Sequence, residues 1–235
     1  MDENGLIIFE IGGNDILDAI QKGLKEKNFE GAKNIIDLAI SGINISLEKV
    51  MSKGACVLYT TVSDIRLLPL IQGGELNEYG EVTEFSSFIN KNEKEMEFIN
   101  CICDYFYNKI MNTIDLLKNK YKDKIEVFDL YKNFGSLVDE YSKLYRKTFN
   151  REVNTLNNYG VDKLIYDNKN KIYTNHNTTI KKIENVNLDD FFYIDNVHPT
   201  RYVHQFMGIK IFNKICELWL NGKDQIKEEL NIIRN

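Results

Sequence analysis

Short apolar runs alternate along the chain with longer segments whose apolar residues recur every three or four positions. Three runs bounded by turn-forming residues are predicted to be buried strands, at residues 6–11, 55–61 and 125–130. A shorter apolar run at residues 191–194 precedes the last predicted helix. Helices are predicted where apolar residues share one face, at residues 16–23, 36–51, 99–117, 131–153 and 199–219. This alternation indicates an α/β fold with a parallel sheet.

Two segments have no such periodicity. Residues 62–92 form a polar, glycine-containing stretch with Pro69, which predicts a loop. Residues 155–187 are rich in Asn, Lys and Thr, and we expect an excursion there with a small hairpin around Ile172 and Ile180. Because no linker divides the chain, one domain is expected over residues 1–235.

Composition narrows the possible functions. The 235 residues are 43% hydrophobic, with 30 basic and 35 acidic residues and a net charge of -5. We expect no nucleic-acid partner, because no dense basic run is present, and no membrane span, because no run of about 18 apolar residues occurs. Four cysteines are expected to be reduced thiols, since they lack the paired spacing of a zinc site: Cys56, Cys101, Cys103 and Cys216.

Two polar clusters follow apolar runs, where parallel strands present their carboxyl ends. Residues 12–15 (Gly-Gly-Asn-Asp) follow the first strand, and residues 195–200 (Asp-Asn-Val-His-Pro-Thr) follow the last apolar run. Ligands of open parallel sheets bind outside these ends. Each cluster alone also fits a plain structural role, the first as a turn with a helix cap and the second as a turn with proline at a helix start.

Together the two clusters supply the groups of an acyl-transfer site. Asp195 precedes His198 by three residues and can bond the Nδ1 proton of the imidazole. Nε2 is then free to take a proton from a hydroxyl nucleophile. Pro199 fixes the backbone directly after His198. The side-chain amide of Asn14 is the kind of donor that stabilises an oxyanion.

The same residues carry a resemblance to a known family. Residues 11–15 resemble the Gly-x-Asn-Asp block of SGNH (GDSL) hydrolases, and residues 195–199 resemble their closing Asp-x-x-His-Pro block. Residues 61–69 are similar to the loop after the next strand in the lipase-like branch. Residues 195–204 resemble the lecithinase/haemolysin-like and esterase members. The resemblance spans nearly the whole chain and is weakest over residues 155–187.

The resemblance implies a three-layer α/β/α, flavodoxin-like sandwich that hydrolyses carboxylic esters, from lipids or other small esters, without a metal or cofactor. It implies that His198 is the general base, that Asp195 orients it and that Asn14 is an oxyanion-hole donor, with Gly12 and Gly13 shaping the turn. Lipolytic members are commonly exported, whereas this sequence shows no export signal, so the compartment stays open.

One block of the family has no counterpart in the sequence. The nucleophilic serine of these enzymes lies in a Gly-Asp-Ser block before the Asn block, which here begins at residue 12. No serine has that context, and Ser63, after the second strand, is the one nearest a catalytic edge. We expect an N-terminally incomplete domain whose missing strands leave residues 6–11 as an exposed edge. The chain would then be part of a longer enzyme, a fragment with a complementing N-terminal segment, or an inactive pseudoenzyme.

Two other interpretations stay open. A non-catalytic interaction module would bind a partner strand along residues 6–11. A flavodoxin-like receiver or nucleotide binder would need an acidic pocket or a glycine-rich phosphate loop, and Gly12 and Gly13 alone do not supply one. His204 is expected on a helix surface, and no role is assigned to His176.

Overall fold

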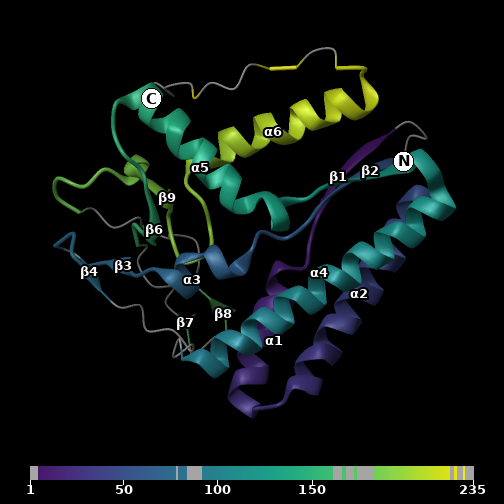
Figure 1. Cartoon of the computed structure of the whole chain (residues 1–235), viewed down its shortest axis with the longest axis horizontal. Coiled ribbons are helices and arrows are strands. Elements are labelled where there is room, and N and C mark those ends of the chain that lie inside the picture. Colours follow the sequence, from purple (N-terminus) through teal and green to yellow (C-terminus); the bar gives the residue numbers. More distant parts are fainter. Residues whose placement is uncertain are drawn as a thin grey trace. The chain divides into compact units, whose positions relative to one another are not determined.

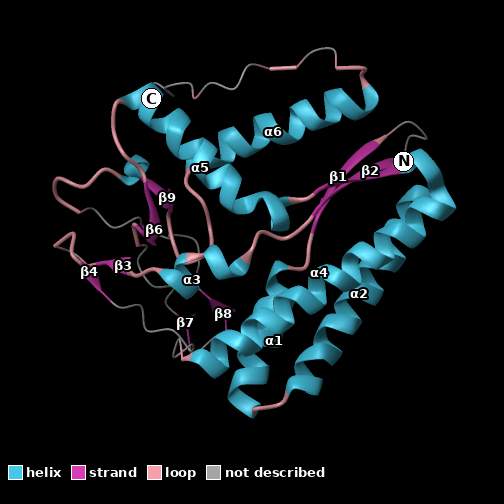
Figure 2. Ribbon diagram, viewed as in Figure 1, coloured by secondary structure: helices cyan, strands magenta, loops and turns pink. Residues whose placement is uncertain are grey.

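A computed structural model describes residues 5–77, 79–83, 92–160, 166–167, 172–173, 183–222, 225–226 and 230. The chain divides into two compact units, residues 1–66 with 88–135 and residues 67–87 with 136–235. Figure 1 labels the helices and strands, and Figure 2 distinguishes them by colour. The expectation of a single domain over residues 1–235 stays a prediction.

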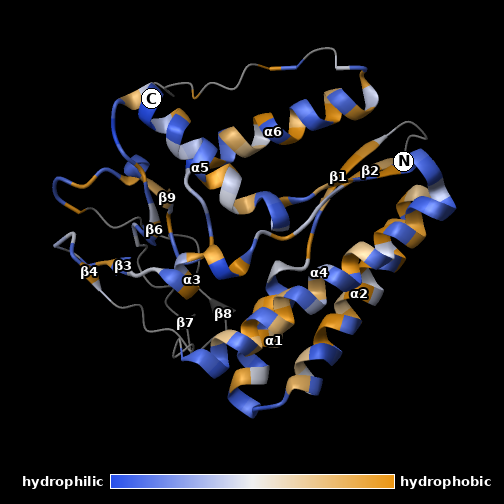
Figure 3. Cartoon of the chain, in the orientation of Figure 1, coloured by the Kyte–Doolittle hydropathy of each residue, from blue (hydrophilic) through white to orange (hydrophobic). Residues whose placement is uncertain are grey.

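The first unit contains a parallel sheet and helices that pack on it. In chain order its elements are β1 (Leu6–Glu10), α1 (Gly13–Glu26), α2 (Phe29–Met51), β2 (Cys56–Thr60), η1 (Ile65–Leu67, which runs into the second unit), α4 (Glu93–Tyr121), η2 (Lys122–Lys124), β5 (Ile125–Phe128) and the start of α5 (Leu130–Phe149). Among the described residues, the sheet has the order β1-β2-β5 with both pairings parallel. β1 and β2 are coloured mainly towards the hydrophobic end of the scale in Figure 3.

The centre of this sheet is β2, whose middle residues Val57, Leu58 and Tyr59 are fully buried. Opposite Leu58 lie Ile8 of β1 and Glu126 of β5. A strand buried on both faces reads as a continuous apolar run, which is how residues 55–61 were recognisable in the sequence.

Asparagine side chains fix where the long helices begin. Asn28 accepts a hydrogen bond from Gly31 N–H (2.9 Å) at the start of α2, and Asn92 accepts one from Glu95 N–H (3.0 Å) at the start of α4. Each therefore satisfies a backbone donor that has no partner within the helix.

Gly12, between β1 and α1, satisfies two constraints that a larger residue would break. Its φ of 114° lies in the left-handed region, and its carbonyl accepts from Ile16 N–H (3.1 Å). A Cβ atom at this position would lie 2.4 Å from Cζ of Phe106 on α4. Both the backbone conformation and the close approach of an aromatic ring therefore require glycine.

The second unit contains a mixed sheet. In chain order its elements are α3 (Pro69–Gln72), β3 (Glu75–Leu76), β4 (Val82–Thr83), the rest of α5, β6 (Asn154–Asn158), β7 (Tyr166–Asp167), β8 (Ile172–Tyr173), η3 (Leu188–Asp190), β9 (Phe191–Tyr193) and α6 (Arg201–Trp219). Among the described residues the sheet has the order β4-β3-β6-β9, with β3 and β4 antiparallel and the other pairs parallel.

Aromatic rings fill the core of the second unit. Tyr141 of α5 is fully buried and contacts Phe192 of β9 and Phe206 of α6, with ring centroids 5.3 and 5.6 Å apart. These edge-to-face contacts are a favoured arrangement of aromatic rings, and they fix β9 between the two helices.

The predicted α/β class with a parallel sheet and packed helices is confirmed, and it is consistent with the three-layer sandwich. The helix predicted over residues 131–153 ends at Phe149, because Asn150 takes a left-handed φ of 52°. Residues 62–92, predicted to be a loop, also contain α3, β3 and β4, which are too short to produce a periodic pattern. A hairpin forms between β7 and β8, and Ile180 lies outside the described residues.

Two further expectations concern cysteines and membrane spans. All four cysteines are free thiols, and burial raises the pKa of Cys103 to about 12. None of the helices in the described part of the chain is both long enough and apolar enough to cross a membrane.

We predict that Gly12→Ala lowers the free energy of unfolding by about 2–4 kcal/mol, because it adds backbone strain and a clash with Phe106. Urea denaturation followed by circular dichroism measures this change. The control is Gly208→Ala in α6, where a Cβ meets no atom within 4 Å and a stabilisation of up to about 1 kcal/mol is expected. Equal unfolding midpoints for the two variants would contradict the prediction.

Candidate active site

Asp195 and His198 lie in the short loop between β9 and α6. Backbone hydrogen bonds fold this loop back onto β9. Ile194 N–H donates to the carbonyl of His198 (2.9 Å), and Thr200 N–H donates to the carbonyl of Phe192 (2.8 Å). The loop is therefore closed at its base, which restricts the positions that its side chains can take.

The carboxylate of Asp195 organises the loop from within. Its Oδ1 accepts from the backbone N–H groups of Val197 (2.9 Å) and His198 (2.7 Å). Its Oδ2 lies 2.7 Å from Nδ1 of the His198 imidazole. One carboxylate thus holds both the backbone and the ring of the residue three positions later, as the spacing in the sequence predicts.

The contact with Asp195 uses one of the two ring nitrogens of His198, Nδ1. The His198 side chain is 72% exposed, whereas the Asp195 side chain is 26% exposed. A proton on Nδ1, donated to Asp195, leaves Nε2 as an acceptor, and a carboxylate in this position stabilises the imidazolium that forms when Nε2 takes up a proton. The pair can therefore act chemically as a general base.

Asn158, at the end of β6, anchors this loop and was not identified from the sequence. Its side-chain Nδ2 donates to Oδ1 of Asn196 (2.8 Å) and to the carbonyl of Gly74 (3.3 Å). The backbone of Asn196 is held as well, because its carbonyl accepts from Leu70 N–H (3.2 Å). Both contacts act on the residue between Asp195 and Val197.

The Asn158 amide is buried at some cost. The residue is 1% exposed, and no donor among the described residues reaches its Oδ1. A buried polar atom without a partner reduces stability, and an apolar side chain of similar size would avoid that loss. What an asparagine supplies here is therefore the two hydrogen bonds that its Nδ2 donates, to Asn196 and to the carbonyl of Gly74.

Asn14 and the two glycines before it lie at the carboxyl end of β1, in the first unit. Gly12 forms the turn, and Asn14 is exposed in the first turn of α1. Gly13 lies beside the loop after β2, since a Cβ on it would be 3.7 Å from Cγ1 of Val62. The structure brings Asp195 and His198 together; the placement of Asn14 beside them stays a prediction, because Asn14 belongs to the other unit.

A polar network at the same edge of the parallel sheet was also missed in the sequence. Asp129, directly after β5, accepts from the hydroxyl of Tyr107 (2.7 Å) and from that of Thr61 (3.4 Å), which directly follows β2. Thr61 accepts in turn from Tyr131 N–H (2.8 Å). Burial and then the hydrogen bond to Asp129 raise the pKa of Tyr107 above its usual range, so its hydroxyl stays protonated as a donor.

Ser63 lies next to a charged cluster in this edge region. Arg66 makes hydrogen bonds to both carboxylate oxygens of Asp64 (2.7 and 2.9 Å), and Tyr131 donates to Asp104 (2.7 Å). Arg66 also reaches Asp104 (3.4 Å). The contacts of this cluster are all made within the first unit, whose sequence contains no histidine.

The other two histidines contribute no further site. His204 is exposed on α6, as predicted, and its N–H donates to the carbonyl of Thr200 (3.1 Å). His176 lies outside the described residues. Within the described ranges, no three His, Cys, Asp or Glu side chains gather in a way that could hold a metal ion.

Comparison with known proteins identifies the family. The family model for GDSL-like lipase/acylhydrolase matches residues 1–211. No curated protein matched the chain. Because the family model covers most of the sequence, the chain belongs to the GDSL-like lipase/acylhydrolase family, which confirms the resemblance drawn from residues 11–15 and 195–199. Fold and family together define a lipase- or esterase-type hydrolase; the lecithinase-like branch stays a prediction.

We predict that Asn158→Leu loosens the loop, because it removes the hydrogen bond to Asn196. The amide protons of Val197 and His198 should exchange with solvent about tenfold faster, measured by NMR hydrogen exchange. Asn196→Ala should have the same effect, and the double variant should be no worse than either single one. Additive effects of the two substitutions would show that the two side chains act independently.

Proposed function

We propose that the chain supplies the general base of a carboxylic ester hydrolase, with Asp195 and His198 as the working pair. The observation that carries this proposal is the 2.7 Å contact between Asp195 Oδ2 and His198 Nδ1, in a loop that leaves the imidazole exposed. Membership of the GDSL-like lipase/acylhydrolase family supports ester chemistry, with lipids or other small esters as the substrate class.

In the proposed reaction, Nε2 of His198 takes the proton of a serine hydroxyl as its oxygen attacks the ester carbonyl. Asp195 stabilises the imidazolium, and the amide of Asn14 donates to the oxyanion of the tetrahedral intermediate. The imidazolium then gives its proton to the departing alkoxide, which leaves as the alcohol. Water repeats the same steps on the acyl-enzyme and releases the carboxylic acid.

The serine of this mechanism has no Gly-Asp-Ser counterpart in the sequence. We propose that a complementing segment supplies it. Without that segment, water is the nucleophile available to His198, and the rate should be lower by several orders of magnitude, because the members of a triad act as a unit.

We predict that the purified chain hydrolyses p-nitrophenyl butyrate slowly and that His198→Ala reduces the rate to that of the buffer. Asp195→Asn should lower kcat by at least about tenfold, since it removes the charge that stabilises the imidazolium. His204→Ala is the matched control and should leave the rate unchanged, because His204 lies apart from any carboxylate contact in the described structure. Equal losses for the two histidine variants would contradict the proposal.

Labelling with a fluorophosphonate, read by intact mass, tests the missing nucleophile separately. We expect no adduct on the chain alone. An adduct that disappears in His198→Ala would show that a serine within the chain is activated, with Ser63 the first candidate, and would overturn the proposed complementation.

A second candidate function rests on the open edge of β1. Within the described sheet β1 pairs with β2 on one side, and its Leu6 and Ile8 side chains are 40% and 53% exposed. An apolar edge strand accepts a further strand from a partner. We therefore propose β1 as the attachment site of a complementing or partner strand.

This proposal predicts that Ile8→Lys slows aggregation of the chain at 37 °C, followed by light scattering, because a charged side chain blocks strand addition. Val82→Lys places the same side chain at a similarly exposed position in β4, at the edge of the other sheet. It serves as the control and should have the smaller effect. The same slowing in both variants would mean that added charge, rather than the β1 edge, is responsible.

A further inference from the structure

The turn between β1 and α1 is held at three consecutive residues by different parts of the first unit. Gly12 packs against the ring of Phe106 on α4, where a Cβ would lie 2.4 Å from Cζ. Gly13 lies beside Val62, in the loop after β2. The residue before these two glycines, Ile11, is held by a side chain of the central strand.

The contact at Ile11 comes from Tyr59 of β2. The Tyr59 hydroxyl donates to the carbonyl of Ile11 (3.2 Å). β1 ends at Glu10, so this carbonyl lies beyond the last residue of β1 that pairs with β2. The tyrosine hydroxyl therefore connects β2 to the segment one residue further along, where the glycine turn begins.

Tyr59 itself has a fixed position. Its side chain is fully buried, and its ring stacks on Phe9 of β1, with centroids 6.1 Å apart. Burial and then the negative charges of Glu10 and Asp15 raise the pKa of Tyr59 above its usual range, so its hydroxyl stays protonated as a donor. A buried hydroxyl without an acceptor costs about 1–3 kcal/mol, which favours the turn conformation in which Ile11 keeps this bond.

Asn14 follows the turn directly and differs from the residues before it. It is exposed in the first turn of α1, and within the described part of the chain no hydrogen bond engages its side-chain amide. A fixed backbone that carries an unengaged amide is what a preorganised oxyanion donor requires, because the position of the donor is then set before the charge develops.

We propose that Tyr59 is a positioning residue for ester hydrolysis: its hydroxyl fixes Ile11 and, through the turn, the backbone from which the Asn14 amide donates to the oxyanion. This inference rests on the proposed function, in which Asn14 is the oxyanion donor. Tyr59 does not touch the substrate, and its effect on the reaction is made through Asn14. This dependence distinguishes it from a residue that only stabilises the fold.

Steady-state hydrolysis of p-nitrophenyl butyrate by the full chain tests the proposal. Attack of water on the ester carbonyl also forms an oxyanion, so even the slow reaction expected of this chain depends on Asn14. Tyr59→Phe removes the hydroxyl and keeps the ring. It should lower kcat about three- to tenfold and leave KM unchanged, because the oxyanion develops only towards the transition state. Asn14→Ala should lower kcat at least as much, and the double variant should be no slower than Asn14→Ala.

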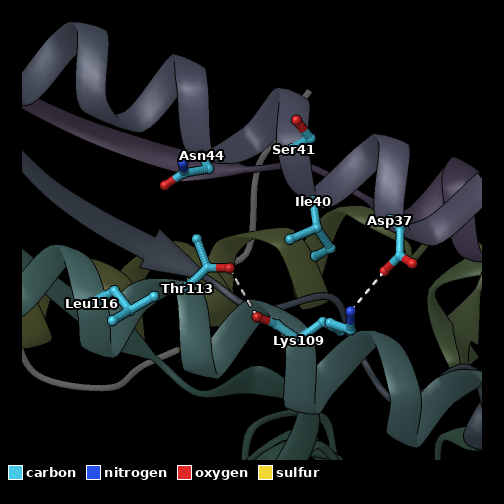
Figure 4. Close-up of a pocket in the computed structure, with 7 residues that line it drawn as sticks. All are labelled: Asp37, Ile40, Ser41, Asn44, Lys109, Thr113 and Leu116. Atoms are coloured by element: carbon cyan, nitrogen blue, oxygen red, sulfur yellow. Dashed lines mark hydrogen bonds and ion pairs between the residues drawn. The ribbon is translucent and has the colours of Figure 1, made fainter.

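Tyr105→Phe is the matched control. Tyr105 lies on α4, and its hydroxyl donates to Asp37 of α2 (3.0 Å), so this variant also loses a tyrosine hydrogen bond within the first unit. Asp37, paired with Lys109 (3.0 Å), lines the groove between α2 and α4 that Figure 4 shows. Because this contact joins two helices and involves neither β1 nor its turn, kcat should stay unchanged.

A second measurement does not depend on hydrolysis. Ile16 N–H donates to the carbonyl of Gly12 (3.1 Å), so its exchange with solvent reports opening of the turn. Measured by NMR, this exchange should be about tenfold faster in Tyr59→Phe, which loses one hydrogen bond to the turn. In Tyr105→Phe it should be unchanged.

The two measurements distinguish failure of this proposal from failure of the proposed function. If His198→Ala does not reduce the rate of the original chain, the proposed function fails, and exchange at Ile16 still decides whether Tyr59 holds the turn. If His198→Ala abolishes hydrolysis but Tyr59→Phe leaves kcat unchanged, the positioning role is overturned. Additive losses from Tyr59→Phe and Asn14→Ala overturn it as well, as does unchanged exchange at Ile16.

Discussion

β2 pairs in parallel with β1 on one side and with β5 on the other, and this pairing determines where the polar residues that follow the strands of the first unit lie. Because all three strands run in the same direction, their carboxyl ends share one edge of the sheet. The Gly12 turn, Thr61 and Asp129 each follow one of these ends directly. Thr61 is itself buried, at 1% exposure, and Gly12 is buried as well, so the burial of β2 extends to the residues that follow the strand ends.

In the second unit a single carboxylate, that of Asp195, positions the residues of the candidate site. Asp195 uses one oxygen for two backbone donors and the other for the His198 ring, so the shape of the loop and the charge beside the imidazole come from the same side chain. One carboxylate can bind both partners because, in a tight turn, the backbone N–H groups two and three positions after an aspartate lie within hydrogen-bond distance of its side chain. A residue outside the loop also holds it in place, because Asn158 on β6 donates a hydrogen bond to the side chain of Asn196.

The parts of the fold and site that the sequence predicts are those set by local spacing. Strand periodicity, the helical faces and the Asp195–His198 pair all depend on residues within a few positions of one another, and the structure contains each of them. The contact of Asn158 with Asn196 joins distant parts of the chain, and no pattern within either segment signals it. Strands as short as β3 and β4 exist because a neighbouring strand pairs with them, so their own two residues carry no periodicity.

The contact between Gly12 and Phe106 has a consequence for the order of folding. The turn after β1 is made of neighbouring residues, but the ring that packs against it belongs to α4, far along the chain. Contacts between distant segments form late, since a long loop must close first. We therefore expect the turn that carries Asn14 to reach its final form only after α4 has packed against it. This part of the candidate site would then be one of the last parts of the first unit to fold, although its residues lie within the first 15 of the chain.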